Sequence, residues 1–127
     1  MQQAGRRILI ADDDAEVREM VRRVAGPQGF EVIEAANAAQ AQALASEQQP
    51  DLIVLDIAFP GEDGRDILAA LKADSRTTKI PVLVWSGRDA ESARRISLGL
   101  GAEDFIEKAS AQALLARIKR LMLRLEK

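Results

Sequence analysis

The chain contains no cysteine, no histidine and no tyrosine, and aromatic residues make up only 3% of it. Because cysteine is absent, disulfides and thiolate metal sites are excluded, and the absence of histidine removes the commonest general base and transition-metal ligand. Few aromatic side chains also argue against nucleic-acid binding by base stacking. Any chemistry of this chain therefore has to use carboxylates, hydroxyls and lysine.

The sequence also lacks a strong charge bias and a long apolar run. Its formal net charge of -2 is too small to steer it toward DNA or an anionic membrane. No apolar run approaches the roughly 20 residues that span a bilayer, and acidic residues follow MQQAGRRILIA where a signal peptide would stay apolar. We therefore expect a cytoplasmic protein without membrane insertion or direct nucleic-acid binding.

What the sequence does contain is a regular alternation of short apolar runs and amphipathic stretches. Its 127 residues predict a single domain at 1–127, and we expect no output domain. Strands are predicted at Ile8–Ala11, Phe30–Ala35, Leu52–Leu55, Val82–Trp85 and Asp104–Ile106. A helix is predicted after each strand. The signals for these helices are the spacing of Val17, Met20, Val21 and Val24, the cap at Asn37, the apolar face of Ile67, Leu68 and Leu71, and the stretch Asp89–Leu100. The last helix, capped by Ser110, is expected to bury Leu114, Leu115, Ile118, Leu121, Met122 and Leu125.

Five alternations of strand and helix predict an α/β fold with a parallel sheet covered on both faces. The first, third and fourth strands are fully apolar and suit the centre, whereas the second alternates and the fifth is short, as edge strands do. The predicted fold is the doubly wound, flavodoxin-like (βα)5 arrangement with strand order 2-1-3-4-5. In such sheets the site lies beyond the carboxyl ends of the strands, between strands one and three.

The run LIVLDIAFP places one aspartate, Asp56, at the end of the third strand. Asp12 and Asp13 end the first strand, its neighbour in the predicted order, so three carboxylates should meet there. Like charges stay ionised together when a cation joins them, and a site made only of oxygens suits Mg²⁺ or Mn²⁺. The sequence therefore predicts a hard-cation site at Asp12, Asp13 and Asp56.

Two further groups end strands on the same edge of the sheet, the Ser86 hydroxyl and the Lys108 ammonium. Carboxylates, a metal, a hydroxyl and an ammonium together are typical of a pocket for a phosphoryl group. In such a pocket a carboxylate is the nucleophile, while the cations and the hydroxyl stabilise the phosphoryl oxygens.

Four segments, ILIADDD, LIVLDIAFPGEDG, VLVWSG and DFIEK, resemble in this order the receiver domain of two-component response regulators. The resemblance covers nearly the whole chain. It implies that Asp56 is the phosphoacceptor. It also implies that Asp12 and Asp13 hold Mg²⁺, with Asp13 the more direct ligand, and that the backbone carbonyl of Ala58 completes the protein ligands.

The same resemblance implies that Ser86 and Lys108 contact the phosphoryl oxygens, and that Ser86 and Phe105 form the switch that responds to phosphorylation. It implies a phosphohistidine donor on a histidine kinase or phosphotransfer protein, followed by hydrolysis that the domain itself assists. The output would go to a downstream protein through the surface of the fourth helix, fifth strand and fifth helix, which could also serve a homodimer.

One departure from the family pattern and several alternatives stay open at this point. Ala109 follows Lys108 where the family usually has proline, often after a cis peptide, so the placement of Lys108 is the weakest part of the assignment. Asp12 to Asp14 could merely cap the first helix, and Asp14 is expected to do only that. Phe105 alone would be a core residue. A phosphate-independent interaction module with this fold is the alternative function, whereas a haloacid-dehalogenase phosphatase would need an aspartate at Ala58.

Overall fold

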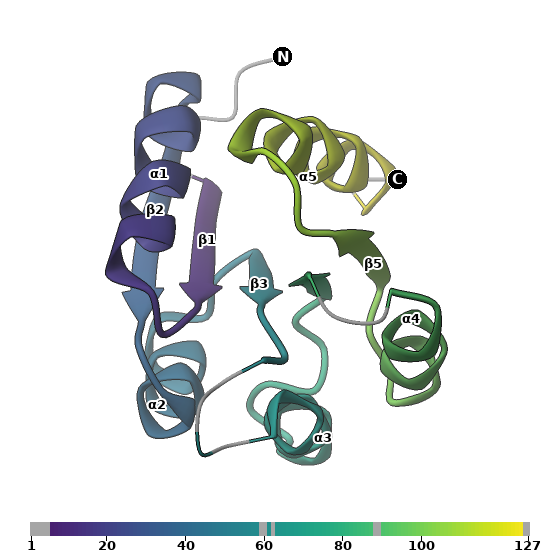
Figure 1. Ribbon diagram of the computed structural model, residues 1–127. Helices are drawn as coiled ribbons and strands as arrows, with labels where there is room; N and C mark the ends of the chain where they lie inside the picture. Colours follow the sequence, from purple (N-terminus) through teal and green to yellow (C-terminus); the bar gives the residue numbers. More distant parts are fainter. Residues whose placement is uncertain (1–5, 59–60, 62, 88–89, 126–127) are drawn as a thin grey trace.

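The computed structural model of the chain describes residues 6–58, 61, 63–87 and 90–125 (Figure 1). Its strands are β1 (Arg6–Ala11), β2 (Phe30–Ala35), β3 (Leu52–Leu55), β4 (Val82–Ser86) and β5 (Asp104–Glu107). Its helices are α1 (Ala15–Ala25), the short η1 (Gly26–Gln28), α2 (Ala38–Gln48), α3 (Gly64–Ala73), α4 (Ala90–Gly99) and α5 (Ala111–Leu125). The strands form one parallel sheet in the order β2-β1-β3-β4-β5, which confirms the predicted fold.

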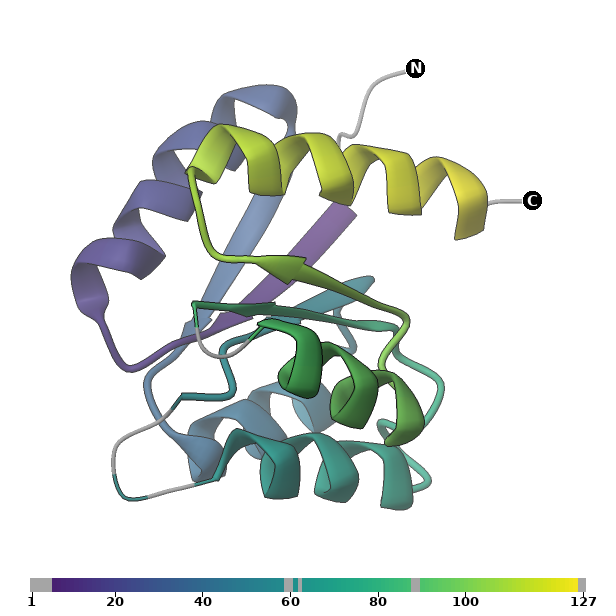
Figure 2. The same ribbon diagram turned by 45° about the vertical axis from the view of Figure 1, so that its right-hand side comes forward.

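Helices cover both faces of the sheet, with α1 and α5 on one face and α2, α3 and α4 on the other (Figure 2). The strands divide their side chains between the two layers with a period of two. On β1, Ile8 and Ile10 pack against α1 and α5, while Leu9 and Ala11 pack against the opposite helices. The three central strands are therefore apolar at nearly every position, as the sequence indicated.

Polar side chains cap the starts of α1, α2 and α5. The Asp14 carboxylate caps α1 by accepting from the backbone N–H of Glu16, so the expected capping role of Asp14 is confirmed. Asn37 caps α2 and Ser110 caps α5 in the same way, as predicted.

The predicted burial on α5 was wrong at its end, where Leu125 is 41% exposed. The buried residues are Leu114, Ile118, Leu121 and Met122, and Leu115 is partly buried against the same core. The last turn of α5 extends beyond the strands, so the helical pattern continues where no sheet is left to cover it (Figure 2).

On α1, Met20 is 45% exposed although it lies at helical spacing with the buried Val21. The predicted start of the fourth helix at Asp89 lies outside the described residues. None of the helices in the described part of the chain combines the length and apolar character needed to cross a membrane.

Candidate functional site

The backbone at the carboxyl edge of the sheet is held by ladder hydrogen bonds that continue one residue past the strands. The Asp12 N–H donates to the carbonyl oxygen of Ala35 at 3.1 Å, and the Asp56 N–H donates to that of Ala11 at 3.0 Å. Both aspartates therefore sit on rigid backbone directly after β1 and β3, which are neighbours in the sheet.

The structure brings together the three carboxylates that the sequence placed at this edge. One oxygen each of Asp12, Asp13 and Asp56 lies within 4.8 Å of the others. Asp12 and Asp56 are buried, at 1% and 6% exposure, and Asp13 is exposed. A cluster of carboxylate oxygens with one side open to solvent fits a hard divalent cation that keeps some of its water, as Mg²⁺ does.

Lys108 lies against this triad. Its Nζ donates to Oδ2 of Asp12 at 2.7 Å and to Oδ2 of Asp56 at 3.0 Å. The peptide between Lys108 and Ala109 is trans, since no described residue has a cis peptide bond. The lysine therefore reaches the acidic residues although it lacks the following proline that is usual in the family that the sequence resembles.

The environment of Lys108 changes its pKa in two opposing ways. Burial of the ammonium is the largest single influence and disfavours the charged form, but the hydrogen bonds to Asp12 and Asp56 and their charges together outweigh it. The net effect raises the pKa of Lys108 above its ordinary value. Lys108 is therefore a fixed positive charge at neutral pH.

The second oxygen of each buried carboxylate is held by backbone. Asp12 Oδ1 accepts from the N–H of Asp14 at 3.0 Å, and Asp56 Oδ1 accepts from the N–H of Ala58 at 2.9 Å. Both carboxylates are thus hydrogen-bonded at both oxygens, which compensates their burial and fixes their orientation.

Ser86 ends β4 at the same edge and is completely buried. Its backbone carbonyl accepts from the N–H of Lys108 at 2.8 Å, so the hydroxyl-bearing residue and the lysine are joined through the backbone. Phe105, the predicted switch aromatic, pairs in register with Val84 and is 6% exposed in the core beneath α2, α3 and α4.

Trp85 adds a contact to the site that sequence reasoning did not find. The Lys108 Nζ lies 5.2 Å from the centroid of the Trp85 ring, within cation–π range. The indole Nε1 is buried and makes no hydrogen bond within the described part of the chain. This contact depends on the conformation of the Lys108 side chain, and no spacing pattern in the sequence predicts it.

A second arrangement that the sequence did not reveal lies behind Asp12. The Arg18 side chain on α1 donates to the Asp12 carbonyl oxygen at 2.6 Å and to Glu34 on β2 at 3.0 Å. Arg18 and Glu34 are 16 residues apart and belong to different elements, so only the fold places them together.

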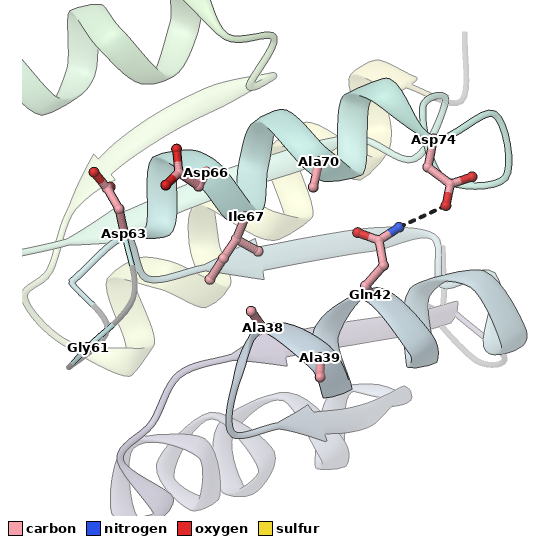
Figure 3. Close-up of a pocket in the computed structure, with 9 residues that line it drawn as sticks. All are labelled: Ala38, Ala39, Gln42, Gly61, Asp63, Asp66, Ile67, Ala70 and Asp74. Atoms are coloured by element: carbon pink, nitrogen blue, oxygen red, sulfur yellow. Dashed lines mark hydrogen bonds between the residues drawn. The ribbon is translucent and has the colours of Figure 1, made fainter.

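A separate groove of about 590 Å³ lies between α2 and α3 (Figure 3). Its described lining residues are Ala38, Ala39, Gln42, Gly61, Asp63, Asp66, Ile67, Ala70 and Asp74. Asp63 and Asp66 extend away from Ala38 and Ala39, and a 3.1 Å hydrogen bond from Gln42 to Asp74 crosses the groove (Figure 3). Hydrogen bonds from Arg65 lower the pKa of Asp63 to about 2. The groove contains none of the triad residues.

Comparison with known proteins gives one consistent result. A family model described as the response regulator receiver domain matches residues 8–119. The phosphate regulon transcriptional regulatory protein PhoB of Pseudomonas aeruginosa is 38% identical over 121 residues, and that of Escherichia coli is 41% identical over the same length. Each alignment covers 94% of this chain and 53% of the relative, so the chain spans about half the length of these curated relatives.

Solved structures agree with the sequence comparison. The crystal structure of a response regulator from Desulfuromonas acetoxidans superimposes with a TM-score of 0.83 and 31% identity, covering 94% of this chain and 98% of that one. The chemotaxis response regulator CheY4 of Vibrio cholerae gives a TM-score of 0.82 and 25% identity, covering 91% and 97%.

Proposed function

The chain belongs to the response regulator receiver domains of two-component systems, and on that premise we propose that Asp56 accepts a phosphoryl group from a partner phosphohistidine. One observation carries the proposal. The Lys108 ammonium bridges Asp12 and Asp56 at 2.7 and 3.0 Å, and Asp13 completes a carboxylate triad within 4.8 Å. A structural role alone would need neither the third carboxylate nor the opening to solvent.

In this reaction a carboxylate oxygen of Asp56 attacks phosphorus as the nitrogen–phosphorus bond to the donor histidine breaks, and the histidine retains the electron pair. Lys108 supplies a positive charge to the phosphoryl oxygens, and the Ser86 hydroxyl donates a hydrogen bond to them. Both residues end strands on the same edge as Asp56, which supports these roles. Water later cleaves the acyl phosphate, so Asp56 is regenerated.

Asp12, Asp13 and Asp56, with the Ala58 backbone carbonyl, would hold Mg²⁺, and Mn²⁺ would satisfy the same oxygen ligands. When bound, the cation supplies positive charge that offsets the carboxylates and the incoming phosphoryl oxygens. The Ala58 N–H already bonds Asp56, so the chain is folded back over the carboxylate at this point.

The proposed partners are a histidine kinase or phosphotransfer protein as donor and a downstream protein as receiver of the signal. The surface of α4, β5 and α5 is the proposed output or homodimer surface, with Ser86 and Phe105 as the switch. It exposes Ile96, Leu98, Leu123 and Leu125 together with Arg94, Arg95 and Arg120. Exposed apolar and basic side chains on these elements suit a protein partner that carries acidic groups.

The direct test is the intact mass of the chain after incubation with a small-molecule phosphodonor and Mg²⁺. We expect a gain of one phosphoryl group in the wild type and none in Asp56→Asn, which keeps the shape of the side chain but removes its charge. Asp66→Asn is the matched control, because Asp66 is an exposed aspartate on α3 outside the triad. It should retain the full gain.

A wild-type chain without any mass gain would contradict the proposal and favour the phosphate-independent interaction module. So would an Asp56→Asn variant that gains as much phosphate as the wild type. Omission of Mg²⁺ separates the roles of the metal and the nucleophile, because the gain should then fall even though Asp56 is intact.

A further inference from the structure

Arg18, near the start of α1, ties the loop that carries the acidic triad to the neighbouring strand. Its Nη1 donates to the backbone carbonyl oxygen of Asp12 at 2.6 Å, and its Nε donates to Oε1 of Glu34 on β2 at 3.0 Å. Only 14% of the Arg18 side chain is exposed. A single guanidinium thus bonds the backbone of a triad residue and a carboxylate on the edge strand at the same time.

Glu34 is itself held in place by a second arginine. Arg22 Nε donates to Oε2 of Glu34 at 3.0 Å, so each carboxylate oxygen of Glu34 has its own guanidinium. The hydrogen bond from Arg22 is the largest influence on the pKa of Glu34, and with Arg18 it lowers that pKa against the opposing effect of burial. Glu34 is therefore a charged anchor for Arg18 at neutral pH.

The bond to the Asp12 carbonyl has a geometric consequence for the next residue. This carbonyl belongs to the peptide unit that joins Asp12 to Asp13, and a peptide unit is planar. A donor that fixes the carbonyl therefore fixes the direction in which the chain enters Asp13. Asp13 is the exposed member of the triad, and within the described residues its carboxylate has no hydrogen bond of its own.

We infer that Arg18 is a positioning residue for the divalent-cation site, which it preorganises by holding the Asp12–Asp13 peptide plane. This inference rests on the proposed function, because the cation concerned is the Mg²⁺ used there. The ladder bond from the Asp12 N–H to Ala35 holds the other side of the same residue. Together the two bonds hold the peptide units on both sides of Asp12. Only the bond from Arg18 comes from a side chain, so only this bond can be removed by a substitution.

The direction of the effect separates positioning from simple electrostatics. Arg18 is a cation that contacts the backbone of a triad residue, so Coulomb's law alone predicts that its removal strengthens Mg²⁺ binding. If Arg18 positions Asp13, its removal weakens binding instead, because part of the binding energy is then spent on ordering the loop. Loss of such an outer partner typically lowers metal affinity by roughly 10- to 100-fold.

The experiment titrates the metal-free full chain with Mg²⁺ alone at constant ionic strength, followed by the fluorescence of Trp85, the only tryptophan, and by calorimetry. Arg18→Met should raise the Kd about tenfold or more. Arg18→Lys should give an intermediate Kd, because one ammonium keeps the charge but cannot bond both partners as a fork does. Arg23→Met is the matched control, since Arg23 lies on the same helix and pairs only with the exposed Glu19 among the described residues.

A folded Arg18→Met variant that binds Mg²⁺ as tightly as the wild type, or more tightly, overturns the inference. Urea denaturation without Mg²⁺ shows whether each variant is folded, and Arg18→Lys decides by the same criterion if Arg18→Met is not. A wild type that gives no response to Mg²⁺ overturns the proposed function and this inference with it. Wild-type binding that is unchanged in both Arg18 variants overturns the inference alone.

Discussion

Two partly buried lysines lie at opposite ends of β4 and differ in every partner. Lys108, beyond the carboxyl ends of the strands, donates to the carboxylates of Asp12 and Asp56. Lys72, in the last turn of α3, donates to the backbone carbonyls of Thr78 and Ile80 at 3.1 and 2.7 Å, just before β4 begins. The pKa of Lys108 is raised, because its carboxylate partners outweigh its burial, whereas burial lowers the pKa of Lys72.

The difference shows how the same side chain serves two purposes. At Lys72 the ammonium satisfies neutral acceptors in a turn, and its charge is a burden that burial makes larger. At Lys108 the charge is what the surroundings require, because two buried carboxylates would otherwise repel each other. We therefore expect the stability lost on substitution of Lys108 to depend on whether Mg²⁺ is bound. The stability lost on substitution of Lys72 should be independent of Mg²⁺.

The largest effect is expected for Lys108→Met. Phosphorylation of Asp56 should slow by about 100-fold, because one of the charges that stabilise the phosphoryl oxygens is gone. In metal-free buffer the free energy of unfolding should fall by about 2 to 3 kcal/mol, since the buried carboxylates lose their compensating charge. Phosphorylation kinetics by intact mass and urea denaturation measure the two effects.

Saturating Mg²⁺ should restore most of the stability of Lys108→Met but not its phosphorylation rate, because the metal replaces the missing charge at the carboxylates and not at the phosphoryl group. Equal destabilisation with and without Mg²⁺ would contradict the idea that Lys108 compensates the metal ligands.

A smaller effect is expected for Lys72→Met. The variant should lose about 1 kcal/mol of unfolding free energy, because two carbonyl acceptors lose a charged donor while methionine retains most of the packing. Mg²⁺ affinity and the phosphorylation rate should stay within about twofold of the wild type, as expected for a change far from the site that alters little but global stability. A Mg²⁺-dependent loss of stability here would erase the contrast between the two lysines.

The pH dependence of stability should sharpen the comparison further. The pKa of Lys72 in the folded chain lies below its ordinary value of 10.5 because burial lowers it, so the unfolded chain holds more protons between the two values. The contribution of Lys72 to the free energy of unfolding therefore increases as pH rises through this window. In urea denaturation, the difference between wild type and Lys72→Met should grow toward pH 10.5. A difference that shrinks over this range would show that the pKa of Lys72 is not lowered in the folded chain.

The smallest effect concerns the contact between Lys108 and Trp85. A double-mutant cycle of Trp85→Leu and Lys108→Met should give a coupling energy of about 0.5 to 1 kcal/mol, typical of a cation–π contact. Unfolding free energies of the four proteins measure it, and the cycle cancels the cost of the cavity that leucine leaves in the core. A coupling energy of zero would mean that the ring only packs beside the lysine.

Much of the fold could be predicted because its signals are local. The alternating stretch Phe30–Ala35 and the apolar run Leu52–Leu55 match β2 and β3 to the residue, and the caps Asn37 and Ser110 begin α2 and α5 as expected. The error at Leu125 came from a helical position whose spacing is apolar but whose neighbours in space are solvent. Periodicity reports which face a residue lies on, and it cannot report where the opposing sheet ends.

The candidate site likewise contains residues that could be predicted from the sequence and contacts that could not. Asp12, Asp13, Asp56, Ser86 and Lys108 could be assigned because each ends a strand, and strand order brings strand ends together. The Arg18 and Trp85 contacts could not, since each depends on the path of a long side chain across another element. The roles of Ser86 and Phe105 as a switch stay predictions, as does the metal.

By itself, the sequence determined the parallel sheet, its strand order and the oxygen-only chemistry of its carboxyl edge, because apolar period and residue type act locally along the chain. Only the tertiary structure decided how Lys108 reaches Asp12 and Asp56 with a trans peptide to Ala109, and that Arg18 holds the acidic loop from behind. Those contacts join residues that are distant in the chain, and side-chain rotamers in a packed interior set them. No pattern of neighbouring residues records such rotamers.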